Sequence, residues 1–151
     1  MLDELGLKVS KALGEIYGSV RRVEDKMLRS SVLNITLSEL DFLDVIGGYG
    51  ESGCSISEIA KGGLVTMPTV TVAIKKLESK GFVEKIRSDA DGRRVRVILT
   101  RMGHKTYAAH RYFHERMVRA LLKEVSEDLR PTVLSALQDL SVFLRKIGDA
   151  P

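Results

Sequence analysis

The chain of 151 residues lacks features on which several classes of protein depend. It contains a single cysteine, Cys54, which excludes an intramolecular disulfide framework and argues against a thiolate metal cluster. No apolar run approaches the roughly 18 residues of a membrane span, and the acidic, amphipathic N-terminus does not resemble a basic-then-apolar signal peptide. We therefore expect a cytoplasmic protein of about one domain, with no membrane partner.

The motifs of catalysis are missing as well. The sequence contains no Gly-rich phosphate loop, no nucleophile elbow, no paired-carboxylate motif and no complete set of metal ligands. The stretch "GGYGESG" at residues 47–53 is rich in glycine, but it lacks the Lys-Ser/Thr ending of a phosphate-binding loop. We therefore expect neither an enzyme nor a bound cofactor. A helical adaptor that binds other proteins is an alternative, although it would leave the basic segment without a role.

The formal net charge of +4 is unevenly distributed along the chain. Residues 75–101 contain nine basic and four acidic residues, so this segment carries +5 and the remainder −1. A localised basic segment is typical of a surface that binds nucleic acid, although such a run is often only a solvated face. Arg93, Arg94 and Arg96 crowd a few positions, where like charges repel one another.

Apolar residues at helical spacing predict a long amphipathic helix over residues 3–29. Thr36 and Glu39 match a capping box, which predicts a second helix over residues 37–46 that stops at Gly47-Gly48. Ser55 and Glu58 repeat the pattern and open a short third helix.

A fourth helix is predicted from about Met67 to Lys80. Thr66 suits its N-cap, Pro68 its first turn and Gly81 the position after its end. The expected buried stripe is Val70, Ile74 and Leu77, with Ala73 beside it. The third and fourth helices together predict a helix-turn-helix.

After Gly81 the pattern alternates, with Phe82, Glu84 and Ile86 on one face and Val83, Lys85 and Arg87 on the other. "VRVILT" follows a turn expected to contain Asp91-Gly92, which predicts a two-stranded hairpin with a basic tip. Such a hairpin is marginally stable by itself, so it must pack on the neighbouring helices.

Helical spacing returns over residues 102–125, and Ser126 is expected to cap a last helix with Pro131 in its early turns. The first helix and these last two hold more apolar residues than a helix-turn-helix and a hairpin could cover. This surplus predicts burial between the subunits of a homodimer.

From Leu37 to Gly103, the segments "SEIA", "TVT", "KKLESKGFV", "DGRRVRVILT" and "MGHK" resemble the winged helix-turn-helix of the MarR family of bacterial transcription regulators. Asp91-Gly92-Arg93 and the terminal "LT…G" are the most specific matches. The resemblance implies a mainly α fold with a small β-hairpin, in a single domain over residues 1–151. Residues 37–101 would then bind double-stranded DNA, and residues 1–30 and 102–148 would form the helices of an intertwined dimer.

By this resemblance, Arg93 matches the wing-tip arginine that enters the minor groove, and Asp91 matches the acid that orients it. The negative potential of a narrow, A·T-rich minor groove would offset the repulsion among the arginines. The family commonly has arginine where Val72 stands; valine can contact a thymine methyl but cannot donate to guanine. We therefore expect an A·T-rich, pseudo-palindromic operator.

The residues expected to contact DNA come from the recognition helix and the wing. They are Thr66, Pro68, Thr69, Thr71, Val72, Lys75, Lys76, Arg87, Asp91, Arg93 and Arg94. Plain solvent-exposed roles remain the alternative for the two lysines and for the turn.

Further stretches resemble the branch of the family that represses fatty-acid biosynthesis genes in Gram-positive bacteria: "LDVIG", "VTMPTVT", "LESKGFVEKIRSDADGRRV" and "HRYFHERMV". That resemblance implies a long-chain acyl group, delivered on acyl carrier protein, in a pocket among the dimerisation helices. The candidate ligand residues are Leu13, Ile16, Tyr17, Val20, Tyr107, His110, Phe113, His114 and Met117. The acidic carrier would dock on Arg21, Arg22, Arg111 and Arg116. An ordinary helical core with snorkelling arginines is the alternative.

Two features suggest other signals. His110 and His114 are four residues apart on one helix, a spacing that binds zinc if a third ligand such as Glu115 or His104 joins them. Cys54 raises the question of peroxide sensing, but the sequence shows no cationic neighbour that would lower its pKa. Small aromatic or drug-like ligands are a further alternative.

Overall fold

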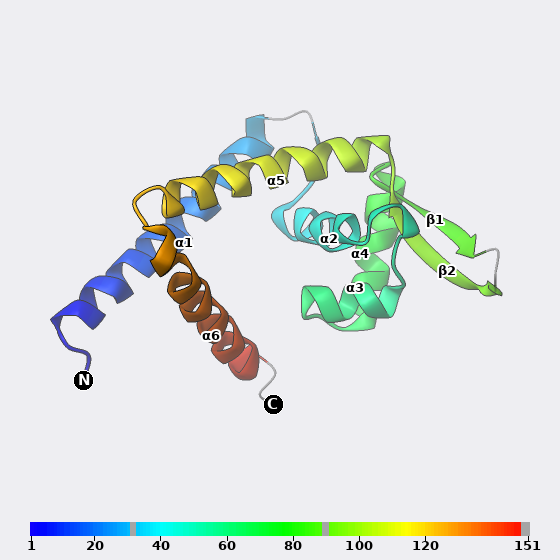
Figure 1. Cartoon of the computed structure of the whole chain (residues 1–151). Coiled ribbons are helices and arrows are strands. Elements are labelled where there is room, and N and C mark those ends of the chain that lie inside the picture. Colours follow the sequence, from blue (N-terminus) through cyan, green and yellow to red (C-terminus); the bar gives the residue numbers. More distant parts are fainter. Residues whose placement is uncertain (31–32, 89–90, 149–151) are drawn as a thin grey trace. The chain divides into compact units, whose positions relative to one another are not determined.

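The computed structural model describes residues 1–30, 33–88 and 91–148, and only the backbone of residues 30, 88 and 91–94. Along the chain, its elements are α1 (Glu4–Ser30), α2 (Leu37–Gly48), the 3-10 turn η1 (Gly50–Ser52), α3 (Ile56–Gly63), α4 (Met67–Ser79), β1 (Val83–Ser88), β2 (Asp91–Leu99), α5 (Arg101–Leu122), the 3-10 turn η2 (Glu127–Leu129) and α6 (Arg130–Gly148) (Figure 1). This confirms the mainly α fold with one hairpin.

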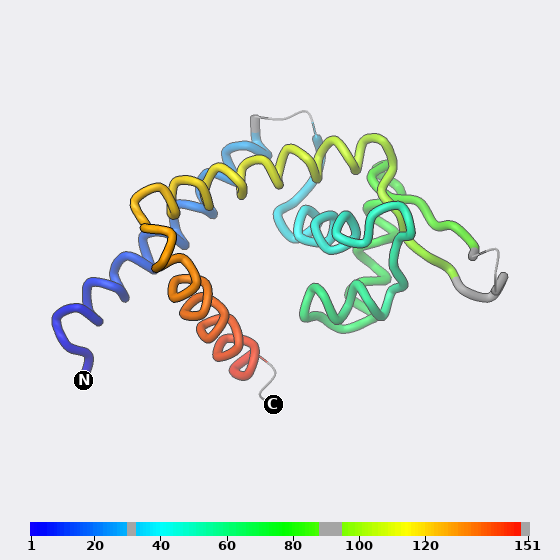
Figure 2. Tube along the Cα trace, in the orientation of Figure 1, coloured from blue at the N-terminus to red at the C-terminus, as the bar shows by residue number. Residues whose placement is uncertain are grey.

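The chain forms two compact units, Met1–Ala108 and Ala109–Pro151, and the boundary falls inside α5. The first unit holds the helix-turn-helix and the hairpin, which follow one another along the trace in Figure 2. Among the helices of the described ranges, none combines the length and the hydropathy that crossing a bilayer would require.

The second and third helices begin as predicted. Thr36 Oγ1 accepts from the Glu39 N–H at 3.2 Å, and the Glu39 carboxylate accepts from the Thr36 N–H at 2.9 Å. Ser55 and Glu58 form the same reciprocal pair. α2 continues to Gly48, two residues beyond its predicted end. Gly47 lies inside the helix at a closely packed position, where a Cβ would lie 2.7 Å from the ring of Tyr107.

The fourth helix, α4, also follows the prediction. The Thr66 side chain accepts from the Thr69 N–H, and Gly81, with φ +78°, follows the C-cap Lys80. The Phe82 N–H then donates to the Leu77 carbonyl at 2.9 Å, which satisfies a terminal acceptor of the helix. The helix itself ends at Ser79, one residue before its predicted end.

One apolar core holds α2, α3, α4 and the base of the hairpin together. Val70, Ile74 and Leu77 are fully buried, as predicted, and Ala73 packs against them half-buried. Their partners in this core are Ile35, Leu40, Phe42, Leu43, Ile46, Cys54, Ile59, Ala60, Phe82, Val83, Val97 and Leu99. Because the inner face of α4 is buried in this cluster, its opposite face points to solvent.

β1 pairs antiparallel with β2, from Val83 opposite Leu99 to Arg87 opposite Val95. Two expectations about this hairpin were wrong. Phe82 and Val83 are both buried, because Phe82 precedes the strand and closes the end of α4. Asp91-Gly92 belongs to β2 rather than to the turn, since a register shift after Arg87 pairs Ser88 with Asp91. Residues 89–90 lie outside the described part.

The "LT…G" pattern has a structural role at the start of α5. The Thr100 hydroxyl donates to the Gly81 carbonyl at 2.6 Å and accepts from the Gly103 N–H at 3.1 Å. A Cβ on Gly103 would collide with the carbonyl oxygen of Phe82. The pattern therefore joins the end of α4, the hairpin and α5 in a small space.

The last helix starts later than predicted. Ser126 precedes η2 without a side-chain cap, and α6 begins at Arg130, with Pro131 as its second residue. No residue of α6 is buried among those described. Its large apolar side chains Leu134, Leu137, Phe143, Leu144 and Ile147 are 47–57% exposed. Such a face requires a covering surface.

A partly buried ion pair connects the start of α2 with the end of α4. Lys80 Nζ lies 2.8 Å from each Glu39 oxygen, and the Glu39 side chain is 8% exposed. Burial raises the pKa of Glu39, but hydrogen bonds from Lys80 and from the Thr36 N–H outweigh it, so the net pKa is lowered.

Glu39→Gln is expected to reduce the free energy of unfolding at pH 7 by about 2 kcal/mol, because it removes a charge-assisted pair. A carboxyl whose folded pKa is lowered stabilises the fold above its unfolded pKa of about 4.3 and loses that contribution as the pH falls through the folded value. Urea unfolding measured from pH 7 to pH 3 should therefore show that the difference in the free energy of unfolding between wild type and variant decreases as the pH falls. The control is Glu78→Gln, in a more exposed pair with Lys85, where we expect less than about 1 kcal/mol. A gap that is constant with pH would contradict a role for the Glu39 charge.

Candidate nucleic-acid interface

The exposed face of α4 gathers the recognition residues expected from the sequence. All seven of them are exposed, on the side opposite to the buried Val70, Ile74 and Leu77: Thr66, Pro68, Thr69, Thr71, Val72, Lys75 and Lys76. The helix thus presents hydroxyls and apolar groups near its start and two ammonium groups further along. Such a surface can contact both base edges and phosphates.

Local hydrogen bonds set what the threonines can do. The hydroxyls of Thr66 and Thr69 lie 2.9 Å apart, and the Thr71 hydroxyl donates to the Met67 carbonyl at 2.9 Å. With its proton used in this way, Thr71 can accept a hydrogen bond from a base amino group but cannot donate to a phosphate.

Apolar side chains are also exposed on this face. Val72 is 55% exposed, and Met67, at the first helical position, is 53% exposed. Met67 is not among the residues that the sequence led us to expect at the DNA. Its position between the N-cap Thr66 and Pro68, at the start of the helix, was the signal that could have indicated it. Both side chains could contact thymine methyl groups.

Several basic residues of the charged segment are bound within the protein. Lys80 pairs with Glu39, and Lys85 Nζ lies 2.6 Å from the Glu78 carboxylate. Lys75, Lys76 and Arg87 are exposed. The count of nine basic residues therefore overstates the positive charge available to a polyanion.

The structure describes the side chain of Arg96 but not those of the charged residues nearer the tip of the wing. The backbone of Asp91, Arg93 and Arg94 is part of β2, whereas their side chains lie outside the described part, so their roles stay predictions. Arg96 is bound to the protein: its Nε donates to the Ser52 carbonyl at 2.7 Å and its Nη2 to the Gly53 carbonyl at 2.6 Å.

Cys54 does not have the properties of a peroxide-sensing thiol. It is fully buried, in an isolated β-bridge to Val97. Burial raises the pKa of the thiol to about 11; the charge of Glu58 adds to this, and Arg96 opposes it. Arg96 is thus a cationic neighbour that the sequence did not reveal. The thiol stays protonated at neutral pH and is a poor nucleophile.

The histidine pair lies in the second unit. The Nε2 atoms of His110 and His114 are 3.0 Å apart, and their rings meet edge to face. In this hydrogen bond one ring donates its N–H and the other accepts. Glu115, one expected third ligand, lies 3.5 Å from Arg111.

The candidate ligand residues divide between the two units. In the first, Leu13, Ile16 and Tyr17 are 41–69% exposed, Val20 is half-buried, and the Tyr107 ring packs over Gly47. In the second, Phe113, His114 and Met117 are half-buried and His110 is buried.

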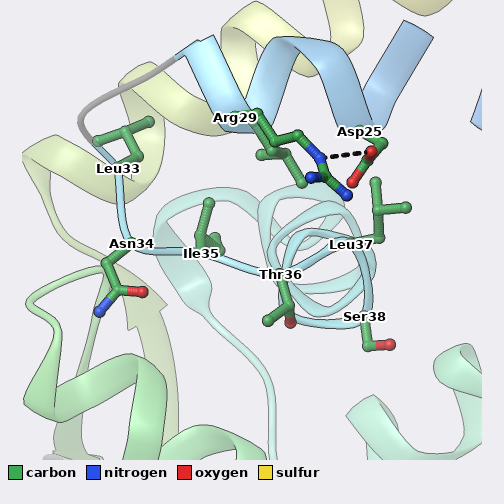
Figure 3. Close-up of a pocket in the computed structure, with 9 residues that line it drawn as sticks. Asp25, Arg29, Leu33, Asn34, Ile35, Thr36, Leu37 and Ser38 are labelled. Atoms are coloured by element: carbon green, nitrogen blue, oxygen red, sulfur yellow. Dashed lines mark hydrogen bonds and ion pairs between the residues drawn. The ribbon is translucent and has the colours of Figure 1, made fainter. Parts of the chain in front are cut away.

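A cavity of about 500 Å³ lies between the end of α1 and the start of α2 (Figure 3). Its lining consists of Asp25, Leu28, Arg29, Leu33, Asn34, Ile35, Thr36, Leu37 and Ser38. Asp25 and Arg29 form an ion pair at 2.7 Å. None of the candidate ligand residues is among these lining residues.

The MarR family model matches residues 33–94, from the segment before α2 into β2. The HTH-type transcriptional regulator BilQ of Clostridium symbiosum is 32% identical over 107 residues, which cover 70% of this chain and 72% of that protein. An uncharacterized HTH-type transcriptional regulator of Bacillus subtilis, YdgJ, is 30% identical over 103 residues, covering 68% of this chain and 62% of that protein.

Solved structures agree with these relatives. FabT of Streptococcus pneumoniae, in complex with DNA, superposes with a TM-score of 0.79 and 31% identity over 93% of this chain and 98% of that one. The S. aureus MepR–DNA complex has a TM-score of 0.71 over 89% of this chain and 95% of that one, and at 23% identity it shows the fold alone. The chain therefore belongs to the MarR family and is a winged helix-turn-helix, DNA-binding transcription regulator, not an enzyme.

Proposed function

We propose that the protein is a homodimeric repressor of fatty-acid biosynthesis genes that responds to long-chain acyl groups on acyl carrier protein. The observation that carries the proposal is the likeness to a FabT–DNA complex over nearly the whole of both chains, at 31% identity. The sequence stretches similar to the fatty-acid branch of the family are consistent with this likeness. A regulator of transcription acts where the chromosome is, so a cytoplasmic location is part of the proposal.

The operator is A·T-rich and pseudo-palindromic. Val72 is exposed on the recognition face and offers a methyl surface in place of the guanidinium that would select guanine. Lys75 and Lys76, exposed on the same helix, neutralise phosphates, and Arg93 enters the minor groove from the wing. Dimer symmetry sets the two recognition helices roughly 34 Å apart, in successive major grooves.

The apolar faces of α1, α5 and α6 support the dimer. Residues such as Val9, Val118, Leu121, Leu137 and Phe143 are 47–57% exposed in the single chain. Covering them with a second copy of the chain removes this apolar surface from water.

The acyl chain occupies apolar surface on the dimerisation helices. Leu13, Ile16 and Tyr17 provide exposed apolar groups on α1, and Phe113 and Met117 half-buried ones on α5. Exposed Arg21, Arg22, Arg111 and Arg116 are suited to an acidic carrier.

The cavity between α1 and α2 favours a second candidate, a sensor of small aromatic or drug-like ligands. Its volume of about 500 Å³ falls within the range of small-molecule sites, and its lining combines apolar residues with an ion pair.

Arg93→Ala is expected to weaken operator binding and to reduce the slope of log K against log salt by about one, because one groove-inserted cation is lost. Fluorescence anisotropy at several salt concentrations measures both quantities. Lys8→Ala is the charge-matched control, since Lys8 is exposed on α1 and paired with Glu4. An affinity unchanged at every salt concentration would remove the wing from DNA binding.

Replacing both Leu137 and Leu144 with Glu is expected to convert the dimer to a monomer, because the charges would be buried in the interface. Light scattering after size exclusion measures the mass. Gln138→Glu, at an exposed polar position of the same helix, should leave the dimer intact. A double variant that stays dimeric would show that α6 does not form the interface.

Operator binding is expected to tighten with long-chain acyl carrier protein and not with the unacylated carrier. Anisotropy on DNA from upstream of the protein's own gene and of fatty-acid synthesis genes measures this response. Arg21→Glu with Arg22→Glu should abolish the response while leaving basal binding intact. Specific binding that is indifferent to the acylated carrier would discard this effector and direct the search to small aromatic ligands.

A further inference from the structure

We propose that Arg96 is a positioning residue of the DNA-binding unit, which fastens the base of the wing to the segment before α3 and so directs Arg93 towards the minor groove. Arg96 belongs to the basic cluster of the wing, yet in this role it does not contact DNA. The inference rests on the role of the wing proposed above.

The Arg96 guanidinium binds two successive backbone carbonyls, those of Ser52 at 2.7 Å and Gly53 at 2.6 Å. Its Nη2 also lies 3.8 Å from the Glu58 carboxylate at the start of α3. The side chain is 31% exposed. A planar fork of donors matches this pair of acceptors, whereas the point charge of a lysine would not.

These carbonyls adjoin a closely packed seam, in which Gly53 and Cys54 lie against Val97 and Ile98 of β2. Arg96 is therefore attached to a rigid support. Gly53 has φ +62°, and a Cβ there would lie 2.5 Å from Ile98 Cγ2 and 2.6 Å from the Val97 carbonyl oxygen. Cys54 and Val97, both fully buried, exchange two backbone hydrogen bonds at 3.0 and 2.7 Å. This seam leaves room only for glycine at position 53.

The other strand of the wing is also attached at its base. Lys85 on β1 is the register partner of Val97, and its ammonium group lies 2.6 Å from Glu78 of α4. The hairpin is therefore fastened by β2 to the segment before α3 and by β1 to the recognition helix. Arg93 is three residues from Arg96 on the same strand, a backbone distance of about 10 Å. A change of angle at Arg96 would thus move Arg93 relative to α4.

A double-mutant cycle on operator affinity tests this role. Arg96→Ala should weaken binding by about tenfold, the scale of one lost charge-assisted contact. In an Arg93→Ala background it should have almost no further effect, because it acts through Arg93. Arg96→Lys should be as weak as Arg96→Ala. Multiplicative effects, with a separate loss of about one in the salt slope, would show a direct phosphate contact and overturn the proposal. Rescue by lysine, or normal binding by Arg96→Ala, would overturn it too.

Cys54 provides a readout that needs no DNA. It is the sole cysteine and lies within the seam, so the rate at which an aromatic disulfide reagent labels it reports local opening. Arg96→Ala and Arg96→Lys should raise this rate several-fold, and Arg93→Ala should not. Equal labelling rates of Cys54 in wild type and in all variants would show that Arg96 does not hold the seam closed. If Arg93→Ala alone leaves affinity unchanged, the proposed role of the wing fails, and the labelling rates still decide whether Arg96 holds the seam. Should Arg96→Ala not fold, Arg96→Lys carries both measurements.

Discussion

The burial of one face of α4 is the constraint on which the DNA-binding unit depends. Val70, Ile74 and Leu77 are fully buried in the core shared with α2, α3 and the hairpin base. An α-helix repeats about every 3.6 residues, so burying this stripe turns Thr69, Val72 and Lys76 to solvent. The apolar core thus determines which side chains a DNA helix can meet.

Ion pairs and hydrogen bonds at the edge of this core fix the orientation of α4 and β2, which apolar packing alone would leave less well defined. Hydrophobic contacts are non-directional, whereas Glu39 with Lys80 holds the end of α4 to the start of α2 at 2.8 Å. Arg96 joins β2 to the carbonyls before α3. These bonds use basic groups that a count of charge would assign to DNA.

Much of this unit was predictable from local patterns. The capping boxes at Thr36 and Ser55, the left-handed Gly81 and the buried stripe of α4 follow from interactions between residues close in sequence, and the structure confirms them. One of the errors arose where distant residues meet. Gly47 was predicted to stop α2, but it lies inside the helix, where the ring of Tyr107, sixty positions along the chain, packs against it; no local rule contains that contact.

The sequence by itself determined the fold class, the starts of α2, α3 and α4, and the family, because capping, periodicity and motif spacing are properties of neighbouring residues. Tertiary structure alone decided which of the described basic groups are bound within the protein. In the sequence, nothing distinguishes these basic residues from Lys75 and Lys76. In the structure, Lys80 is bound to Glu39, Lys85 to Glu78, and Arg96 to the backbone before α3. The physical reason is that an ionic or hydrogen-bonding partner is set by distance in space, and these partners lie 7 to 44 residues away in the chain.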